Sequence, residues 1–395
     1  VQDGSGDAIT GTVTISGANP TLAQLKIIND SVAGTVVVPS KTVALSGTAA
    51  VLAAALAGTV QDTSGDALTG AVTVSDDATV SIAATVLSAI GGGTSGTVTV
   101  SNAITITGDT SQAIAALDTE STKVTAGTAK VTLSDTPSLD NLKKINDATS
   151  GTIKILSGSE AYSGTAEVLA AALTGTVTDT SDAVLTGAMT ITGSNPTPAE
   201  LQTINNATTG NVIIPAKTVA LTATAAVLEE ALAGTVQDGS GDAITGTVTI
   251  TGDNPNATQL QSINNAVAGT VVVPNKTVAL SGTAAVLAAA LTGTVQEVTS
   301  GDAITGTVTI TGADPTPAEL QTINNSVAGT IVVPDKTVTL SSTAAVLAAA
   351  LTGTVQDSLA AALTGAVTVS DDATASIAAT VLSTIGGGTS GTVTV

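Results

Sequence analysis

The sequence predicts an α/β solenoid, in which a parallel sheet runs along an array of 59-residue repeats and short helices flank it. Two observations carry this prediction. The chain repeats itself at a nearly constant interval, and each repeat alternates strand-like and helix-like patterns. Alternating strands and helices imply parallel strands joined by right-handed crossovers.

The interval is visible in the phrase TGTVQ or TGTVT. Its valine falls at Val177, Val236 and Val295, so the spacing is the same each time. Residues 1–15 return letter for letter at 236–250. The chain therefore divides into repeat units 1–59, 177–235, 236–294 and 295–354, variant units 60–118 and 119–176, and a partial unit 355–395. Since no capping unit is visible, we expect either a longer array or another molecule that covers each end.

The first half of a repeat reads as a strand followed by a helix. In 304–310 the sequence ITGTVTI alternates as a strand does. Thr316 then fits a helix N-cap, Pro317 the first helical position and Glu319 the third residue of a capping box. Gly329 is predicted to end this helix. One helical face is apolar in every such segment, as in Leu320, Ile323 and Val327; Leu25, Ile28 and Val32; Leu142 and Ile145; Leu201 and Ile204; and Leu260, Ile263 and Val267.

The second half adds a strand pair, TIVVP and KTVTL, which Pro334 interrupts, and then a second helix, AAVLAAAL, which Thr343 can cap. The predicted order is strand, helix, strand, helix, with roughly 29 residues per half, near the range of leucine-rich repeats. A β-solenoid is the alternative fold, with the Ala-rich segments as corner turns. Small Ala side chains let a helix lie close to a sheet, which favours the α/β solenoid.

Composition excludes several classes of function. The chain has no His, Cys, Phe or Trp, its ten basic residues are all Lys, and its formal charge is −21. Tyr162 is the only aromatic residue. Such a chain lacks the basic stripe and aromatic platform of a nucleic-acid binder. It lacks the side chains of Ser-His, Cys-His and zinc sites, so we predict no enzyme. Its longest apolar runs, such as 49–58, are about half of a bilayer span, so we expect no membrane insertion.

Acidic residues recur in the turn DGSGDA and its variants. Stacked repeats would place them in two columns along one edge, and carboxylates with turn carbonyls are ligands that Ca²⁺ prefers. The alternative is that Asp, Ser and Gly are here simply good turn formers. The columns hold Asp3, Asp62, Asp179, Asp238 and Glu297, then Asp7, Asp66, Asp182, Asp242 and Asp302. The candidate calcium ligands are Asp3, Asp7, Asp62, Asp66, Asp238, Asp242, Glu297 and Asp302.

Two further patterns have a structural and a functional interpretation. The acid pairs Asp76/Asp77 and Asp371/Asp372 are typical of helix starts, and a metal role is the alternative.

Threonines alternate along the predicted strands, as in Thr10, Thr12 and Thr14. Such a ladder on a flat sheet can bind ice or a crystalline sugar, but it is also the ordinary solvated face of a β-branched strand.

The helical segment PTPAELQTINNATTG (196–210) and the segment TAAVLAAALTGTV (283–295) recur along the chain. This style of repeat resembles the tandem repeats of very large secreted or surface proteins of bacteria, cyanobacteria in particular. The resemblance covers essentially the whole chain. It implies an extracellular or cell-surface protein of a surface layer, adhesin, matrix or appendage, often with calcium.

We therefore expect a structural protein that forms an extracellular filament, sheath or surface layer by end-to-end or lateral assembly with copies of itself. The alternative is a calcium-dependent adhesin stalk or a ligand-binding solenoid for a glycan or ice, with cell-surface glycans as partners.

Overall fold

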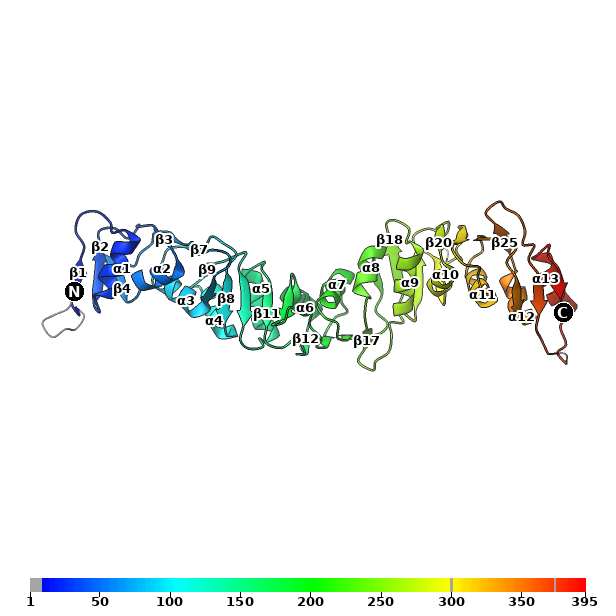
Figure 1. Cartoon of the computed structure of the whole chain (residues 1–395). Helices are drawn as coiled ribbons and strands as arrows, with labels where there is room; N and C mark the ends of the chain where they lie inside the picture. Colours follow the sequence, from blue (N-terminus) through cyan, green and yellow to red (C-terminus); the bar gives the residue numbers. More distant parts are fainter. Residues whose placement is uncertain (1–8, 299–300, 373) are drawn as a thin grey trace. The chain divides into compact units, whose positions relative to one another are not determined.

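The computed structural model describes residues 9–298, 301–372 and 374–395. It contains two compact units, Val1–Thr190 with Ala207–Gly210 and Ile191–Asn206 with Asn211–Val395. Each unit by itself is a succession of coils that carry parallel strands and one helix (Figure 1). The predicted α/β solenoid architecture is therefore confirmed within each unit.

A full repeat consists of two coils, each with two strands and a helix. In the repeat that begins at Val236, the first coil contains β17 (Val236–Asp238), β18 (Val248–Thr251) and α9 (Ala257–Ala266). The second contains β19 (Thr270–Val273), β20 (Leu280–Gly282) and α10 (Ala284–Ala290). The strand pair predicted on either side of Pro334 is confirmed as β23 (Thr330–Val333) and β24 (Leu340–Ser342). The single strand predicted before the first helix is wrong, since β17 and β18 both precede α9.

The two coils of a repeat differ in length. The first coil runs from Val236 to Val271, and the second, shorter coil runs from Val271 to Val295, with which Val271 pairs in register. The longer coil contains the acidic turn, where Gln237 and Ala243 form an antiparallel bridge that reverses the chain. The expectation of two equal halves missed this asymmetry, because the repeat interval reports only the sum of the two coils.

The strands of each unit form several small parallel sheets rather than the single continuous sheet that the sequence predicted. In the sheet that contains β18 and β19, each pair of neighbouring strands is parallel. Pro274 follows β19 directly and cannot donate to a ladder, so the chain leaves one sheet there and β20 opens the next. The sheet orders are β1-β2-β4, β3-β5-β7-β9 and β6-β8-β10-β11-β13 in the first unit, and β15-β17, β16-β18-β19-β21, β20-β22-β23-β25 and β24-β26-β27 in the second.

The strands of the first unit are β1 (Val13–Thr14), β2 (Thr35–Val38), β3 (Leu45–Gly47), β4 (Thr59–Asp62), β5 (Val72–Val74), β6 (Ser81–Ala83), β7 (Val98–Val100), β8 (Thr105–Gly108), β9 (Val124–Thr125), β10 (Lys130–Leu133), β11 (Ile153–Ile155), β12 (Tyr162–Gly164) and β13 (Val177–Asp179). Strand β14 (Met189–Ile191) spans the boundary of the two units. The other strands of the second unit are β15 (Val212–Ile214), β16 (Leu221–Thr224), β21 (Thr294–Glu297), β22 (Val308–Ile310), β23 (Thr330–Val333), β24 (Leu340–Ser342), β25 (Thr354–Asp357), β26 (Val367–Val369) and β27 (Val393–Thr394).

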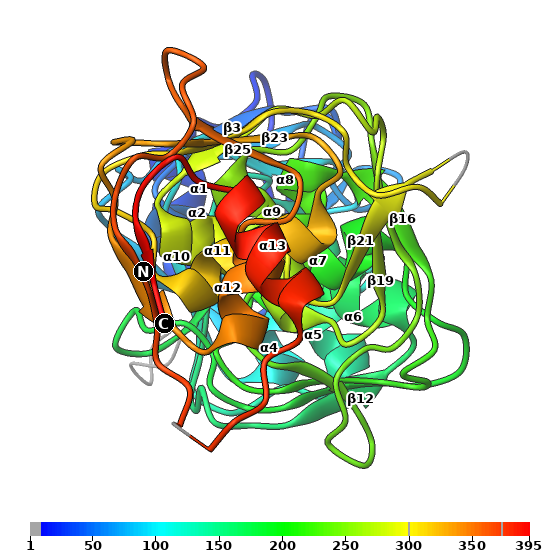
Figure 2. The ribbon, with the colours of Figure 1, turned by 90° about the vertical axis from the view of Figure 1, so that its right-hand side faces the viewer.

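Successive helices stack on one another within each unit, as Figure 2 shows for α10 to α13 of the second unit. The first unit contains α1 (Leu22–Asp30), α2 (Ala49–Ala55), α3 (Ala84–Gly92), α4 (Thr110–Leu117), α5 (Leu139–Ala148) and α6 (Ala166–Leu173). The second adds α7 (Pro198–Asn206), α8 (Ala225–Ala231), α11 (Pro317–Ser326), α12 (Ala344–Ala350) and α13 (Ala379–Gly387).

The core between helices and sheets is aliphatic. Leu260 and Ile263 of α9 and Leu287 of α10 are fully buried, as the predicted apolar face requires. Leu25 and Leu142 are buried in the corresponding helices of the first unit. Alanine-rich helices suit this core, because their small side chains let the helix axis approach the strands closely.

The local signals at α11 are partly confirmed. Thr316 and Glu319 form the predicted capping box, with Pro317 as the first helical residue. Gly329, however, does not cap this helix, which ends at Ser326 with Val327 as its C-cap. A Cβ at Gly329 would lie 2.3 Å from the carbonyl oxygen of Gly306, so glycine is required there by the close approach of the backbone segments that lead into the paired strands β22 and β23.

Tyr162 occupies a core position of β12 and is 5% exposed. Its hydroxyl donates to the carbonyl oxygen of Pro137 at 3.2 Å. Burial, followed by the charge of Glu160, raises the pKa of Tyr162 to about 12 from an ordinary value of 10.0. Between these two values, the folded chain keeps the phenol proton while the unfolded chain loses it.

We therefore expect the free energy of unfolding to fall as pH rises from about 10 towards 12, by about 1.4 kcal/mol per pH unit from this one group. Urea unfolding of the wild type and of Tyr162→Phe over this range measures the effect. The wild type should be the more stable protein near pH 10, and its advantage in free energy of unfolding should shrink and then reverse as pH rises. Lysine titration affects both proteins alike and cancels in the comparison. Parallel pH curves would show that Tyr162 ionises as freely as an exposed tyrosine.

Candidate functional site

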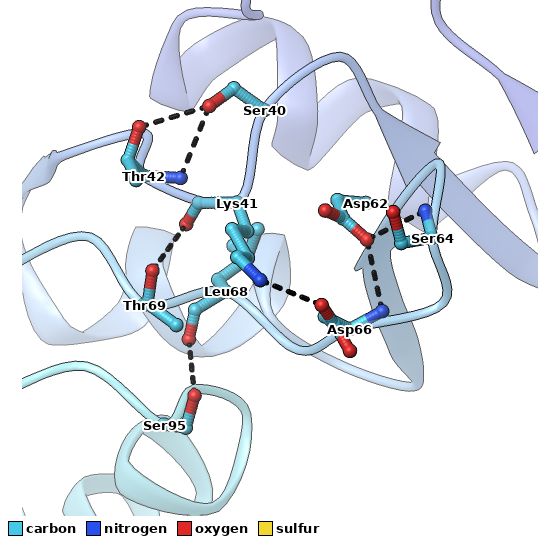
Figure 3. A network of polar contacts seen from close by, with 9 residues as sticks. All are labelled: Ser40, Lys41, Thr42, Asp62, Ser64, Asp66, Leu68, Thr69 and Ser95. Atoms are coloured by element: carbon cyan, nitrogen blue, oxygen red, sulfur yellow. Dashed lines mark hydrogen bonds and ion pairs between the residues drawn. The ribbon is translucent and has the colours of Figure 1, made fainter.

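The acidic turns are held by their own first carboxylate. In the turn after β4, Asp62 Oδ1 accepts hydrogen bonds from the backbone N–H groups of Ser64 at 2.8 Å and Asp66 at 2.9 Å (Figure 3). These bonds, the one from Asp66 first, lower the pKa of Asp62 below its ordinary value. Asp238 binds Ser240 and Asp242 in the same way, and its pKa is lowered too.

The second acid of the turn forms an ion pair with a lysine of the preceding coil. Lys41 Nζ lies 2.6 Å from Asp66 Oδ2 (Figure 3). The pair recurs as Lys217 with Asp242 at 2.6 Å and Lys276 with Asp302 at 3.4 Å. All three pairs are half exposed, so solvent screens them and each contributes little stability alone. Each pair joins the loop that carries the lysine to the acidic turn of the next coil.

The predicted calcium ligands that the structure describes already have partners within the protein. Asp62 with Asp66, and Asp238 with Asp242, share a turn, but the carboxylates are engaged by backbone N–H groups and lysines. Glu297 and Asp302 also share a turn, where the Glu297 N–H donates to the Asp302 carbonyl oxygen at 3.0 Å. Asp3 and Asp7 lie outside the described residues. Within the described residues, no group of three or more acidic side chains could hold a metal ion.

Calcium binding stays a prediction, and thermal unfolding tests it. If Ca²⁺ bridges the acidic turns, its binding to the folded state should raise the unfolding midpoint above that in chelator or in Mg²⁺ at matched ionic strength. Equal midpoints in the three solutions would leave the acids as turn formers.

The turn acids make a prediction about acid pH. Because the pKa of Asp238 is lowered in the folded state, its contribution to stability is present above the ordinary pKa of 3.8 and is lost as pH falls through the folded value. Asp238→Asn keeps the oxygen acceptor but cannot titrate. The variant should therefore lose less stability than the wild type between about pH 4 and pH 2 in urea unfolding. Asp253→Asn, at an exposed acid outside the turns, is the control, and identical pH slopes for wild type and Asp238→Asn would contradict this role.

The first acid of each pair, Asp76 or Asp371, caps the start of a helix, as one interpretation predicted in part, but the helix belongs to the preceding coil and the second acid takes no part. Asp76 Oδ2 accepts a hydrogen bond from the N–H of Ala49, the first residue of α2, at 2.6 Å. Asp371 binds Ala344, the first residue of α12, at 2.5 Å. Thr48 and Thr343, the N-cap residues of these helices, make no side-chain cap bond of their own. The next coil therefore supplies the cap.

A column of buried and half-buried asparagines was not predicted from the sequence. Asn264, on the core side of α9, donates from Nδ2 to the carbonyl oxygens of Ala289 at 3.0 Å and Thr292 at 2.5 Å. These carbonyls lie at the C-terminal end of α10, where a helix leaves its acceptors unpaired. The same contact is made by Asn29, Asn146, Asn205 and Asn324, each with a carbonyl 25 residues later. The sequence contains a pattern that could have indicated this column. Each of these asparagines lies four residues after a buried leucine and therefore shares the helical face of that leucine.

The polar groups described so far join one coil to the next and recur along each unit, rather than converging on one place. In the described part of the chain, no helix is both long and apolar enough to cross a bilayer. Neither a scan of protein-family models nor a search of curated proteins found a match for the chain.

Proposed function

We propose that this chain is a structural protein of the cell exterior, which builds a filament, sheath or surface layer by end-to-end or lateral assembly with copies of itself. One observation carries the proposal. The asparagine caps, the Lys–Asp pairs and the aspartate caps all recur between neighbouring coils. A protein whose ordered polar groups maintain a repeating scaffold is suited to mechanical and architectural roles.

The location outside the cell is supported by the style of the repeats and by the composition. A formal charge of −21 and a chain free of cysteine suit an acidic extracellular material that does not depend on disulfides. Like charges on neighbouring copies repel each other, and salt screens them over about 8 Å at physiological ionic strength. Assembly of such copies should therefore depend on ionic strength.

Sedimentation velocity of the purified chain over a range of protein and salt concentrations tests the proposal. We expect the sedimentation coefficient to rise with protein concentration, and more steeply at physiological salt than at low salt. A single monomeric species at every protein concentration and at both ionic strengths would contradict assembly. Urea-unfolded protein provides the control for aggregation that does not need the folded coils.

A further inference from the structure

A polar pocket of about 300 Å³ opens on the sheet that contains β8, β10 and β11 in the first unit. Its walls are side chains from these strands and from the acidic turn that follows β13. The lining residues are Thr105, Lys130, Thr132, Thr152, Lys154 and Asp182. The volume is near the lower end of the range for small-molecule sites.

The pocket lies where the repeat pattern is broken at two positions. Lys154 is the middle residue of β11, a position that holds aliphatic residues in the other repeats, Val37, Ile213, Val272 and Val332. Asp182 stands in its turn where most equivalent turns have a glycine, such as Gly65 or Gly241, and where the turn after β25 has Ala360. Its φ of 66° lies in the left-handed region, which costs a non-glycine residue of order 1 kcal/mol. The two exceptions meet, since Lys154 Nζ lies 2.7 Å from Asp182 Oδ1.

The charges and hydroxyls of the pocket are not all used by the protein. Asp182 pairs with Lys154, whereas Lys130 forms no ion pair within the described residues, so the formal charges of the lining side chains sum to +1. The carboxylate of Asp179, which does not line the pocket, also interacts with Lys154. Beside Lys154, in register on the next strand, lies Thr178. Thr178 does not line the pocket: its Oγ1 is buried without a hydrogen-bond partner in the described chain, so the hydroxyls that face the pocket are those of Thr105, Thr132 and Thr152. Equivalent positions hold the longer glutamines Gln61, Gln237, Gln296 and Gln356.

We propose that this pocket binds an acidic sugar, a pyranose ring that carries one carboxylate or sulfate. Lys130 would pair with the charged group, while threonine hydroxyls and the Asp182 carboxylate would bind ring hydroxyls. An acidic side chain of a second copy is the competing occupant. It would leave most of a 300 Å³ pocket and its hydroxyls unfilled, which favours the sugar. This binding activity goes beyond the structural role proposed above.

Calorimetric titration of the full chain with glucuronate, glucose and inorganic sulfate, at physiological salt, tests the proposal. Glucuronate should bind more tightly than sulfate, and glucose should bind at least about tenfold more weakly than glucuronate, because it lacks the charge for Lys130. Lys130→Gln should weaken glucuronate binding by about tenfold or more. Lys217→Gln, at a lysine paired with Asp242 outside the pocket, is the matched control and should bind as the wild type does.

Three results would each overturn the proposal. The first is that glucuronate does not bind the wild type, and the second is that it binds Lys130→Gln with unchanged affinity. The third is that sulfate binds as tightly as glucuronate, which would make the pocket a general anion site. If glucuronate does not bind and Lys130→Gln instead reduces self-association in the ultracentrifuge, the occupant is a second copy. Failure of sugar binding with intact self-association leaves the structural proposal standing, so the two tests fail separately.

Discussion

Gly246→Ala should destabilise the chain severely, by about 3 kcal/mol or more. A Cβ at Gly246 would lie 1.9 Å from the carbonyl oxygen of Val219 in the preceding coil, and 2.5 Å from its carbonyl carbon. Both atoms belong to the backbone, so no change of rotamer can relieve the contact. The two coils would have to separate, which would also disturb the pairing of Leu221 with Val248. Urea unfolding followed by circular dichroism measures the loss.

The chain contains its own control for this substitution. Gly11 lies in the identical fifteen-residue sequence, and a Cβ there would meet nothing within 4 Å. Gly11→Ala should therefore change the free energy of unfolding by less than about 1 kcal/mol, through backbone entropy alone. Because the local sequence is the same, the difference between the two variants isolates the contact between coils. Equal effects would mean that the coils do not touch at Gly246.

Asn264→Ala should cost about 2–3 kcal/mol, because it removes two hydrogen bonds and leaves the carbonyls of Ala289 and Thr292 without their partner. Asn264→Asp should be at least as damaging at neutral pH, since a carboxylate repels the carbonyl oxygens that the amide binds. The measurement is urea unfolding of both variants beside the wild type.

Asn265→Ala is the matched control, since Asn265 is the next residue of α9 and is exposed. Both alanine variants gain the same helix propensity, so the difference between them reports the buried amide. If Asn265→Ala and Asn264→Ala prove equally stable, the asparagine column does not hold one helix to the next.

Local signals in the sequence predicted local structure well. The capping box of Thr316 and Glu319, the start at Pro317 and the buried face of Leu320 and Ile323 depend on neighbours within a few residues, and all are found in α11. The repeat interval likewise predicted a periodic α/β architecture. These features follow from spacing alone, because each helix and strand presents a face of known period.

The contacts between coils could not be predicted in the same way. Asp76 lies 27 residues after Ala49, whose N–H it binds, and Asn264 lies 25 residues before Ala289. A repeat interval shows that such positions recur, but not which position of one coil lies against which position of the next. The division into small sheets was missed for a related reason. The sequence predicted a strand on each side of Pro334, but not that the two strands, β23 and β24, pair in different sheets.

The candidate site shows the same limit. The sequence identified the acidic turns, and the structure assigns their first carboxylates to backbone N–H groups and their second to lysines such as Lys41 and Lys217. The lysines could not be recognised as partners, because each lies in the coil before its aspartate and far from it in the sequence. The pocket at Lys154 and Asp182 could have been noticed as a break in the repeat, but only the fold brings these two exceptions together.

Self-assembly is visible directly by electron microscopy of the purified, folded chain at physiological salt. We expect filaments or a two-dimensional lattice of regularly spaced copies, whose abundance rises with protein concentration. Dispersed single particles at every concentration that the protein tolerates, with the fold intact by circular dichroism, would contradict a structural role through self-assembly.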